Sequence, residues 1–221
     1  MEFYHVLNRG VDKRNIFLND KDHLRFVHDL FEFNDTANAV AVNYYAQSTD
    51  VGRPKVGRKR ELLVYLHCFC LMPNHYHLLL SPARDNGIPL FMKKLNGGYA
   101  KYFNEKYKRI GALFQGKYKS VSIQRDAHFL HIPFYIHFNP LDLIMPEWRQ
   151  NKLKNIKKAE QYLESYRWSS HSDYLGHKNF SSVTQRNSLS KFFENKQEYK
   201  NKTREMLRFF NDDDLIVNNL E

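Results

Sequence analysis

The stretch LLVYLHCFCLMPNHYHLLLS, residues 62–81, contains two apolar runs on either side of Pro73 and Asn74. Each run has the length of a strand, and a Pro-Asn pair is typical of a tight turn. The pattern therefore predicts a β-hairpin. His75 and His77 open the second run. Because side chains alternate along a strand, both imidazoles should lie on one face of the sheet.

Two imidazoles that point the same way provide half of a divalent-metal site. A structural histidine pair is an alternative, because the chain has 11 histidines. Another alternative is a Cys2His2 zinc site that includes Cys68 and Cys70. The i, i+5 spacing of Cys70 and His75 and the need for four ligands on one small sheet face count against zinc.

The composition is that of a folded, basic protein. Of the 221 residues 42% are hydrophobic, which favours one domain with a core, and the net charge of +10 favours a polyanionic partner such as nucleic acid. The first residues lack a signal-peptide pattern, and no apolar run approaches the ~20 residues of a membrane span. Two cysteines spaced i, i+2 do not predict a disulfide. We therefore expect a cytoplasmic, nucleoid-associated protein with no membrane partner.

Hydrophobic periodicity predicts the remaining elements. Strands are expected at 2–8, 38–47 and 112–123, and helices at 19–33, 89–109, 126–140 and 189–210. A polar, basic insertion at 48–62 interrupts this order. The order favours an α+β fold, in which helices pack on one face of an antiparallel sheet in a ferredoxin-like arrangement.

Three helix features lead to predictions of their own. Asn19 or Asp20 is expected to cap the first helix. Gly97 and Gly98 weaken helix propensity and predict close packing or a bend in the second helix. Pro133 predicts a kink or a late start in the third helix.

The third helix also carries residues with chemical potential. Tyr135 and Asn139 are spaced i, i+4, so they share a helix face. If that face covers the sheet near His75 and His77, Asn139 can offer an amide oxygen as a third metal ligand. Tyr135 would then lie beside the metal, where a cation favours its phenolate form and orients a phosphodiester for in-line attack. A core role for Tyr135 is the alternative, since the chain has 14 tyrosines.

Four motifs occur together in one order, and the sequence resembles a known family through them. They are MPNHYHLLL (72–80), LFQGKYKS (113–120), YIHFNP (135–140) and YRWSSHSDYLG (166–176), and YHVLNRGVDKRNIF (4–17) precedes them. Their order and spacing resemble the REP-associated tyrosine transposases, which belong to the HUH superfamily of single-strand nucleases. The resemblance covers roughly residues 3 to 176.

The resemblance implies a ferredoxin-like HUH nuclease domain over 1–176, followed by a basic helical extension and acidic tail over 177–221. It implies that His75, His77 and Asn139 bind Mg2+ or Mn2+. It further implies that Tyr135 attacks single-stranded DNA, forms a 5′-phosphotyrosine link and releases a 3′-OH. The partner would be single-stranded or hairpin DNA, and no nucleotide cofactor would be needed.

The sequence departs from the family pattern at three places. The insertion at 48–62 is longer than expected between those strands. Pro133 and Phe134 precede the tyrosine where relatives often carry an aliphatic residue and an arginine. The segment after Leu175 has no family match.

DNA contacts can be predicted from charge and position. The candidates are the basic residues Arg9, Lys13, Arg14, Arg53, Arg58, Lys93, Lys94, Lys101, Lys117, Lys119 and Arg125, with Phe114, Tyr118 or Trp168 stacking on bases. Each of these residues alone is more often a solvated surface charge or a core aromatic.

The sequence leaves two rival functions open. One is a DNA-hairpin-binding protein that does not cut, and the other is a metal-dependent hydrolase with no covalent step. The intact set of His75, His77, Tyr135 and Asn139 favours a transposase, a strand-transferring endonuclease, over both. The chain could act as a monomer or a homodimer.

Overall fold

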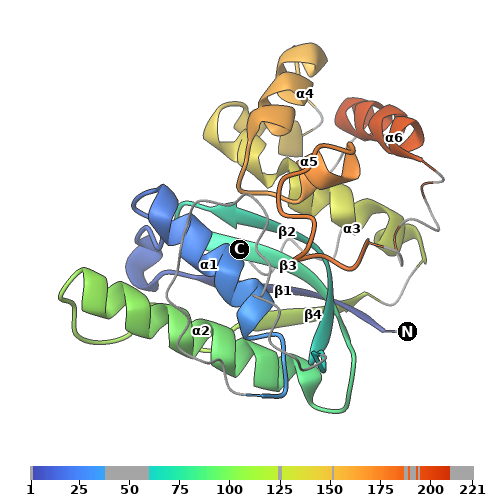
Figure 1. Cartoon of the computed structure of the whole chain (residues 1–221). Coiled ribbons are helices and arrows are strands. Elements are labelled where there is room, and N and C mark those ends of the chain that lie inside the picture. The colour runs from blue at the N-terminus through green and yellow to red at the C-terminus, as the bar shows by residue number, and fades with distance from the viewer. Residues whose placement is uncertain are drawn as a thin grey trace.

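The computed structural model describes residues 2–37, 60–123, 126–150, 152–186, 189, 193 and 195–209. Within them the chain forms an antiparallel sheet in the order β2-β3-β1-β4 (Figure 1). The strands are β1 Phe3–Arg9, β2 Val64–Met72, β3 His75–Pro82 and β4 Lys119–Ile123. The strand predicted at 38–47 and most of the 48–62 insertion lie outside the described residues.

Helices cover both faces of this sheet, which corrects the expectation of one covered face (Figure 1). The α-helices are α1 Asp20–Glu32, α2 Gly87–Lys106, α3 Asp126–Phe138, α4 Ile156–Ser165, α5 His171–Tyr174 and α6 Lys196–Phe209. The short 3-10 helices are η1 Val11–Lys13, η2 Asn139–Leu143 and η3 Pro146–Arg149. Helices α1 and α2 pack on one face, while α3 and the elements after it pack on the other. Both faces need cover because β2 and β3 are apolar on both sides.

The predicted β-hairpin is confirmed, with Met72 paired to His75 across the Pro73-Asn74 turn. The segment that follows β1 fixes this turn. The backbone N–H of Gly10 donates to the Asn74 carbonyl, and those of Ile16 and Phe17 donate to the Pro73 carbonyl. The start of β3, and with it the histidine pair, is therefore held at one end of the sheet.

Asn19 caps α1, as predicted, through a reciprocal capping box with Asp22. The close packing predicted at the glycine pair is also confirmed. A Cβ atom at Gly98 would clash with the ring of Phe33, whereas nothing lies within 4 Å of one at Gly97.

Several predicted elements differ from the structure in their bounds. The strand predicted at 112–123 forms only from Lys119, because Gly116 has a φ of +73° and interrupts extended backbone. Helix α3 extends from Asp126 to Phe138 with Pro133 inside it, so Asn139 begins the 3-10 segment instead of continuing the α-helix. The C-terminal basic helix begins at Lys196, later than the predicted residue 189. No helix in the described ranges combines the length and hydropathy needed to span a bilayer.

Each face of the sheet has its own hydrophobic core. The core on the α1–α2 side includes Phe180 and Val183, and the core on the α3 side includes Tyr199 and Leu207. Residues from beyond position 176 thus contribute to both cores. The division into 1–176 and 177–221 stays a prediction.

Candidate active site

Three histidines meet on the α3 side of the sheet. In the register of β1 against β3, Leu7 pairs with His77 and Arg9 pairs with His75, so His5 lies diagonally beside His77. The His5 Nε2 and His77 Nδ1 atoms are 2.9 Å apart, and the two rings stack at 5.1 Å between centroids. The His75 ring meets that of His77 edge-on at 4.8 Å.

Hydrogen bonding fixes the tautomer of His75. The Asn74 side-chain nitrogen donates to the Lys13 carbonyl at 3.1 Å, which turns its oxygen toward His75. His75 Nδ1 lies 2.7 Å from that oxygen and must therefore donate to it. The lone pair is then on Nε2, which is buried without a hydrogen-bond partner among the described residues. A partner on the far ring nitrogen is the arrangement that orients metal-binding histidines.

Burial keeps these imidazoles neutral. It lowers the pKa of His5 and of His75 to about 3, and it lowers the pKa of His77 well below the usual value. Positive charge on Arg9 and Arg149 lowers the pKa of His75 and His77 further. Neutral imidazole is the form of histidine that binds metals.

Tyr135 in α3 and Asn139, the first residue after α3, lie on the same side of the sheet as this histidine cluster. The Tyr135 side chain is buried, and its ring meets those of His5 and His77 edge-on at 5.8 and 5.9 Å. The Asn139 side-chain nitrogen donates to the backbone carbonyl of Tyr135 at 2.8 Å, which fixes the direction of its amide oxygen. The structure thus brings together the four residues that the sequence singled out.

Arg149 is a site residue that the sequence reading missed. Its Nη1 donates to the Tyr135 hydroxyl at 3.2 Å, and its Nη2 donates to the Asn139 amide oxygen at 3.0 Å. Asp142 holds the guanidinium in turn, with Nε–Oδ1 at 2.9 Å and Nη2–Oδ2 at 2.6 Å. The Trp148 indole donates to the same carboxylate at 2.7 Å. The Arg149 guanidinium therefore contacts both the Tyr135 hydroxyl and the Asn139 amide oxygen.

Three groups of this candidate site are of types that bind divalent cations. They are the Nε2 lone pair of His75, the imidazole of His77 and the oriented amide oxygen of Asn139. Two nitrogens and one oxygen suit Mn2+, and Mg2+ is the harder alternative. Within the described ranges, no group of three or more His, Cys, Asp or Glu residues is placed to hold a metal.

The Cys2His2 zinc site was the alternative prediction. In the described part of the chain, Cys68, Cys70 and the histidines do not form a group that could hold a metal. Cys70 does pair with His77 across the hairpin, and Cys68 pairs with Leu79. Both thiols are fully buried, and burial raises the pKa of each well above its usual value. Zinc binds the thiolate, which this environment disfavours.

A basic groove opens beside the histidines. It is a cavity of about 260 Å³ lined by Leu7, Asn8, Arg9, Lys13, Gln115, Lys117 and Lys119. Four of the predicted DNA-contacting residues, Arg9, Lys13, Lys117 and Lys119, therefore line one groove. The groove adjoins the histidines because Leu7 and Arg9 pair with His77 and His75.

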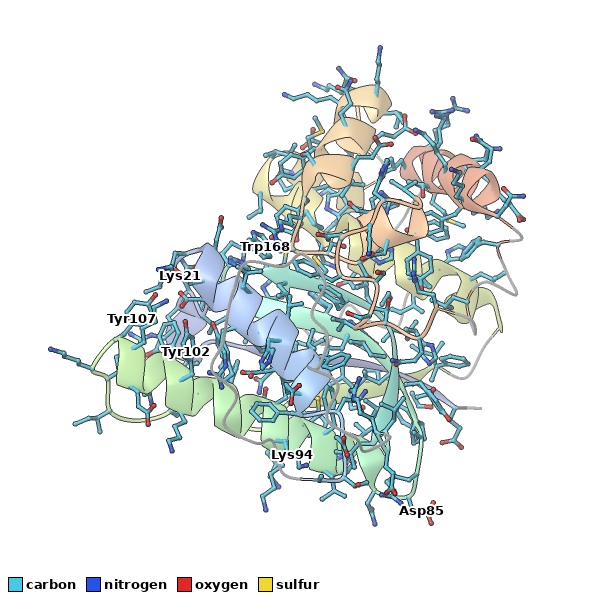
Figure 2. All side chains as sticks on the ribbon, in the orientation of Figure 1. Lys21, Asp85, Lys94, Tyr102, Tyr107 and Trp168 are labelled. Atoms are coloured by element: carbon cyan, nitrogen blue, oxygen red, sulfur yellow. The ribbon has the colours of Figure 1, made fainter. Side chains whose placement is uncertain are left out.

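The other predicted DNA contacts lie elsewhere. Lys93, Lys94 and Lys101 are on α2, which packs on the opposite face of the sheet. Lys94 points toward the end of α1 (Figure 2), where its ammonium group donates to the carbonyls of Asp35 and Ala37. Lys101 pairs with Glu105 at 3.8 Å. Arg14 is exposed next to Lys13. The side chains of Arg53, Arg58 and Arg125 lie outside the description.

The aromatic candidates for base stacking have protein partners. Phe114 is buried and Tyr118 is half-buried. Trp168 stacks on His23 at 4.4 Å and on Phe180 at 6.1 Å, near the start of α1 (Figure 2). Their roles toward DNA stay predictions.

His5 and Arg149 were missed for different reasons. His5 alternates correctly within the first predicted strand, but only the pairing of β1 with β3 reveals that it lies beside His77. Arg149 lies in an irregular 3-10 segment, where no periodicity indicates its direction.

Part of the chain matches a known family model. Residues 57–139 match the model of the family described as "Transposase IS200 like". A solved REP-associated tyrosine transposase bound to a REP hairpin is similar over 82% of this chain and 83% of that chain, with 10% identity and a TM-score of 0.45. Curated protein sequences gave no significant match.

Proposed function

We propose, from the match of residues 57–139 to the IS200-like transposase family, that this chain is a metal-dependent single-strand DNA endonuclease and strand transferase. It would act on hairpin-flanked DNA through a 5′-phosphotyrosine intermediate. The observation that carries the proposal is the position of the Tyr135 hydroxyl, which accepts from Arg149 beside two neutral imidazoles and an oriented amide oxygen.

His75, His77 and Asn139 would hold Mg2+ or Mn2+, and the ion would neutralise phosphate oxygens and orient the phosphodiester. The remaining chemistry belongs to the chain. The phenol oxygen of Tyr135 attacks phosphorus, the new O–P bond forms, and the P–O3′ bond breaks. The phenol proton passes to solvent, and the released 3′ oxygen takes up a proton. A second 3′-OH reverses the step and joins strands.

Arg149 would supply the charge that this step needs. Its N–H donates to the phenol oxygen, so it orients the nucleophile and stabilises the negative charge that develops there. Asp142 limits the motion of the guanidinium through its own two contacts. The ordering of these groups before DNA arrives lowers the entropy cost of attack.

The basic groove would lead a single strand to the tyrosine. Arg9, Lys13, Lys117 and Lys119 carry four positive charges along it, and such a groove binds phosphates without regard to sequence. The partner would be single-stranded or hairpin DNA. A monomer or homodimer in the cytoplasm, associated with the nucleoid, stays our prediction.

The decisive experiment looks for a covalent adduct. The protein is incubated with 5′- and 3′-labelled hairpin-flanked single-stranded DNA and Mn2+ or Mg2+, then separated under denaturing conditions. We expect an adduct in the wild type that EDTA abolishes. We expect none in Tyr135→Phe, which keeps DNA affinity. The matched control is Tyr65→Phe, because Tyr65 pairs with Ser81 at the other end of the hairpin from His75.

The rival functions give different results. Cleavage that survives Tyr135→Phe would exclude the covalent mechanism and favour a metal-dependent hydrolase. Tight hairpin binding with no cleavage under either metal would favour a DNA-binding protein.

A further inference from the structure

A buried hydrogen-bond network lies against a second face of α3. His137 Nδ1 is 2.7 Å from the Tyr199 hydroxyl, and His171 Nδ1 is 2.9 Å from the same hydroxyl. On its other side, His137 Nε2 is 2.8 Å from the Ser170 hydroxyl. All four side chains are buried. The Tyr199 hydroxyl therefore links α6 to two imidazoles from other elements.

The network extends from Tyr199 through His137 and Ser170 to β2. The backbone N–H of Phe69 donates to Ser170 Oγ at 2.9 Å, so the chain of contacts begins on β2. Burial keeps both imidazoles neutral, since it lowers the pKa of His171 to about 3 and that of His137 well below its usual value. A neutral imidazole donates from one nitrogen and accepts at the other, which matches the two contacts of His137. The Tyr199 hydroxyl is the shared partner of His137 Nδ1 and His171 Nδ1. Removal of this hydroxyl would take a hydrogen-bond partner from both buried nitrogens.

Aromatic packing holds the same helix. The Tyr199 ring stacks on that of Phe134 at 5.5 Å with 15° between planes. Phe193 meets both rings edge-on, at 5.6 Å from Phe134 and 5.3 Å from Tyr199. Phe134 and His137 are spaced i, i+3 and share a face of α3, on either side of Tyr135 in sequence. Tyr135 and Asn139 face the histidines of the sheet instead.

Helix α3 needs such support near its nucleophile. Pro133 lies inside the helix and cannot donate a backbone hydrogen bond, so the helix is weakened just before Tyr135. Misplacement of a reacting group by about 1 Å can cost about 100-fold in rate.

We infer that α6 is a positioning element for Tyr135, with Tyr199 as the positioning residue that holds α3 through His137 and Phe134. The expected effect on the rate of adduct formation rests on the proposed function. The support of α3 by α6 does not. Helix α6 is itself held against α4, where Arg204 pairs with Glu160 at 3.0 Å and Lys200 pairs with Glu164 at 3.1 Å.

The test replaces Tyr199 with phenylalanine, which removes only the hydroxyl. Its matched control is Tyr99→Phe. That hydroxyl is also buried and bonded, to the Ile16 carbonyl at 2.6 Å, but it lies on the opposite face of the sheet. We expect Tyr199→Phe to lower the single-turnover rate of adduct formation at least about 10-fold while the Kd for DNA stays unchanged. Tyr99→Phe should lower stability without this loss of rate.

A second measurement separates the inference from the proposed function. Hydrogen exchange of the α3 backbone amides should accelerate in Tyr199→Phe and stay at the wild-type rate in Tyr99→Phe. This result is readable even if the wild-type protein forms no adduct. Unchanged exchange in α3, or an equal loss of rate in both variants, would overturn the inference.

Discussion

At the scale of single residues, Arg149 joins the two halves of the candidate site. Its guanidinium contacts the Tyr135 hydroxyl and the Asn139 amide oxygen, and it lies 4.8 Å from the Trp148 ring centroid. A planar fork can meet several acceptors at once, whereas an ammonium group acts as a point charge. The shape of this side chain should therefore matter as well as its charge.

Arg149→Lys tests this point. We expect the rate of adduct formation to fall roughly 10- to 100-fold, because lysine keeps the charge but cannot contact Tyr135, Asn139 and Asp142 together. The measurement is a single-turnover time course at saturating DNA and Mn2+. Arg167→Lys is the control, since Arg167 is exposed and lies over Trp168. A wild-type rate in Arg149→Lys would show that charge alone suffices.

Residue spacing was enough to single out part of the site. The i, i+2 histidines follow from the repeat of a strand, which is a local property. The i, i+4 spacing also singled out Tyr135 and Asn139, although Asn139 begins the 3-10 segment and is not part of α3. His5 and Arg149 depend on which strands pair and on the path of a 3-10 segment. Both depend on tertiary packing, so no local pattern encodes them.

At the scale of elements, the adjacent glycines of α2 have opposite surroundings. Gly98 lies under the ring of Phe33, which follows α1, while Gly97 has open space around it. The close approach of α1 to α2 therefore depends on one of the two glycines.

Gly98→Ala and Gly97→Ala form a matched pair. We expect Gly98→Ala to lower the free energy of unfolding by about 1–3 kcal/mol, because the new methyl group displaces the Phe33 ring. Gly97→Ala should raise it by up to about 1 kcal/mol, because alanine has the higher helix propensity. Urea unfolding followed by circular dichroism measures both. Equal effects at the two positions would contradict this packing.

Element predictions succeeded where a periodic run was long and had clear ends. The Pro73-Asn74 turn of the hairpin and the Asn19 cap of α1 are both recognisable from residue type alone. The strand at 112–123 was predicted too long because Gly116 adopts a positive φ that an apolar pattern does not indicate. Phe134 departs from the family pattern, and its stacking on Tyr199 explains the aromatic side chain there. This explanation could not be reached from the sequence, because it depends on where α6 packs.

At the scale of the whole molecule, positive charge is spread over both faces of the sheet, but the basic groove gathers it beside the histidines. The net charge of +10 was readable from the sequence, and its distribution was not. Pairing of β1 with β4 brings residues near 9 and near 119 together, and that pairing is long-range.

Salt dependence should separate the groove from the rest of the surface. Each phosphate contact to single-stranded DNA contributes about 0.7 to the slope of log K against log salt, so Lys117→Gln with Lys119→Gln should reduce the slope by about 1.4. The control pair is Lys93→Gln with Lys101→Gln on α2, which should leave the slope unchanged. Fluorescence anisotropy titrations at about 50 to 300 mM salt measure this slope. An equal reduction by both pairs would place the DNA elsewhere.

Buried histidines predict a loss of stability in acid. Burial lowers the pKa of His67 to about 4 and that of His171 to about 3. Below about pH 6.5 the unfolded chain binds protons that the folded chain does not, so stability is full above that pH and falls toward the folded pKa. Each histidine contributes roughly 1.4 kcal/mol per pH unit in that window. Urea unfolding at pH 7.5 and 5.5 measures the effect, and a constant or rising stability at pH 5.5 would contradict it.

The burial of Cys68 and Cys70 has a practical consequence for labelling. They are the chain's two cysteines, and the raised pKa of both thiols keeps them out of the reactive thiolate form. Maleimide dyes should therefore leave the folded native protein unmodified. Ile110 is 99% exposed, so Ile110→Cys would provide a single attachment point. A fluorophore there could report DNA docking in real time with every native cysteine left in place.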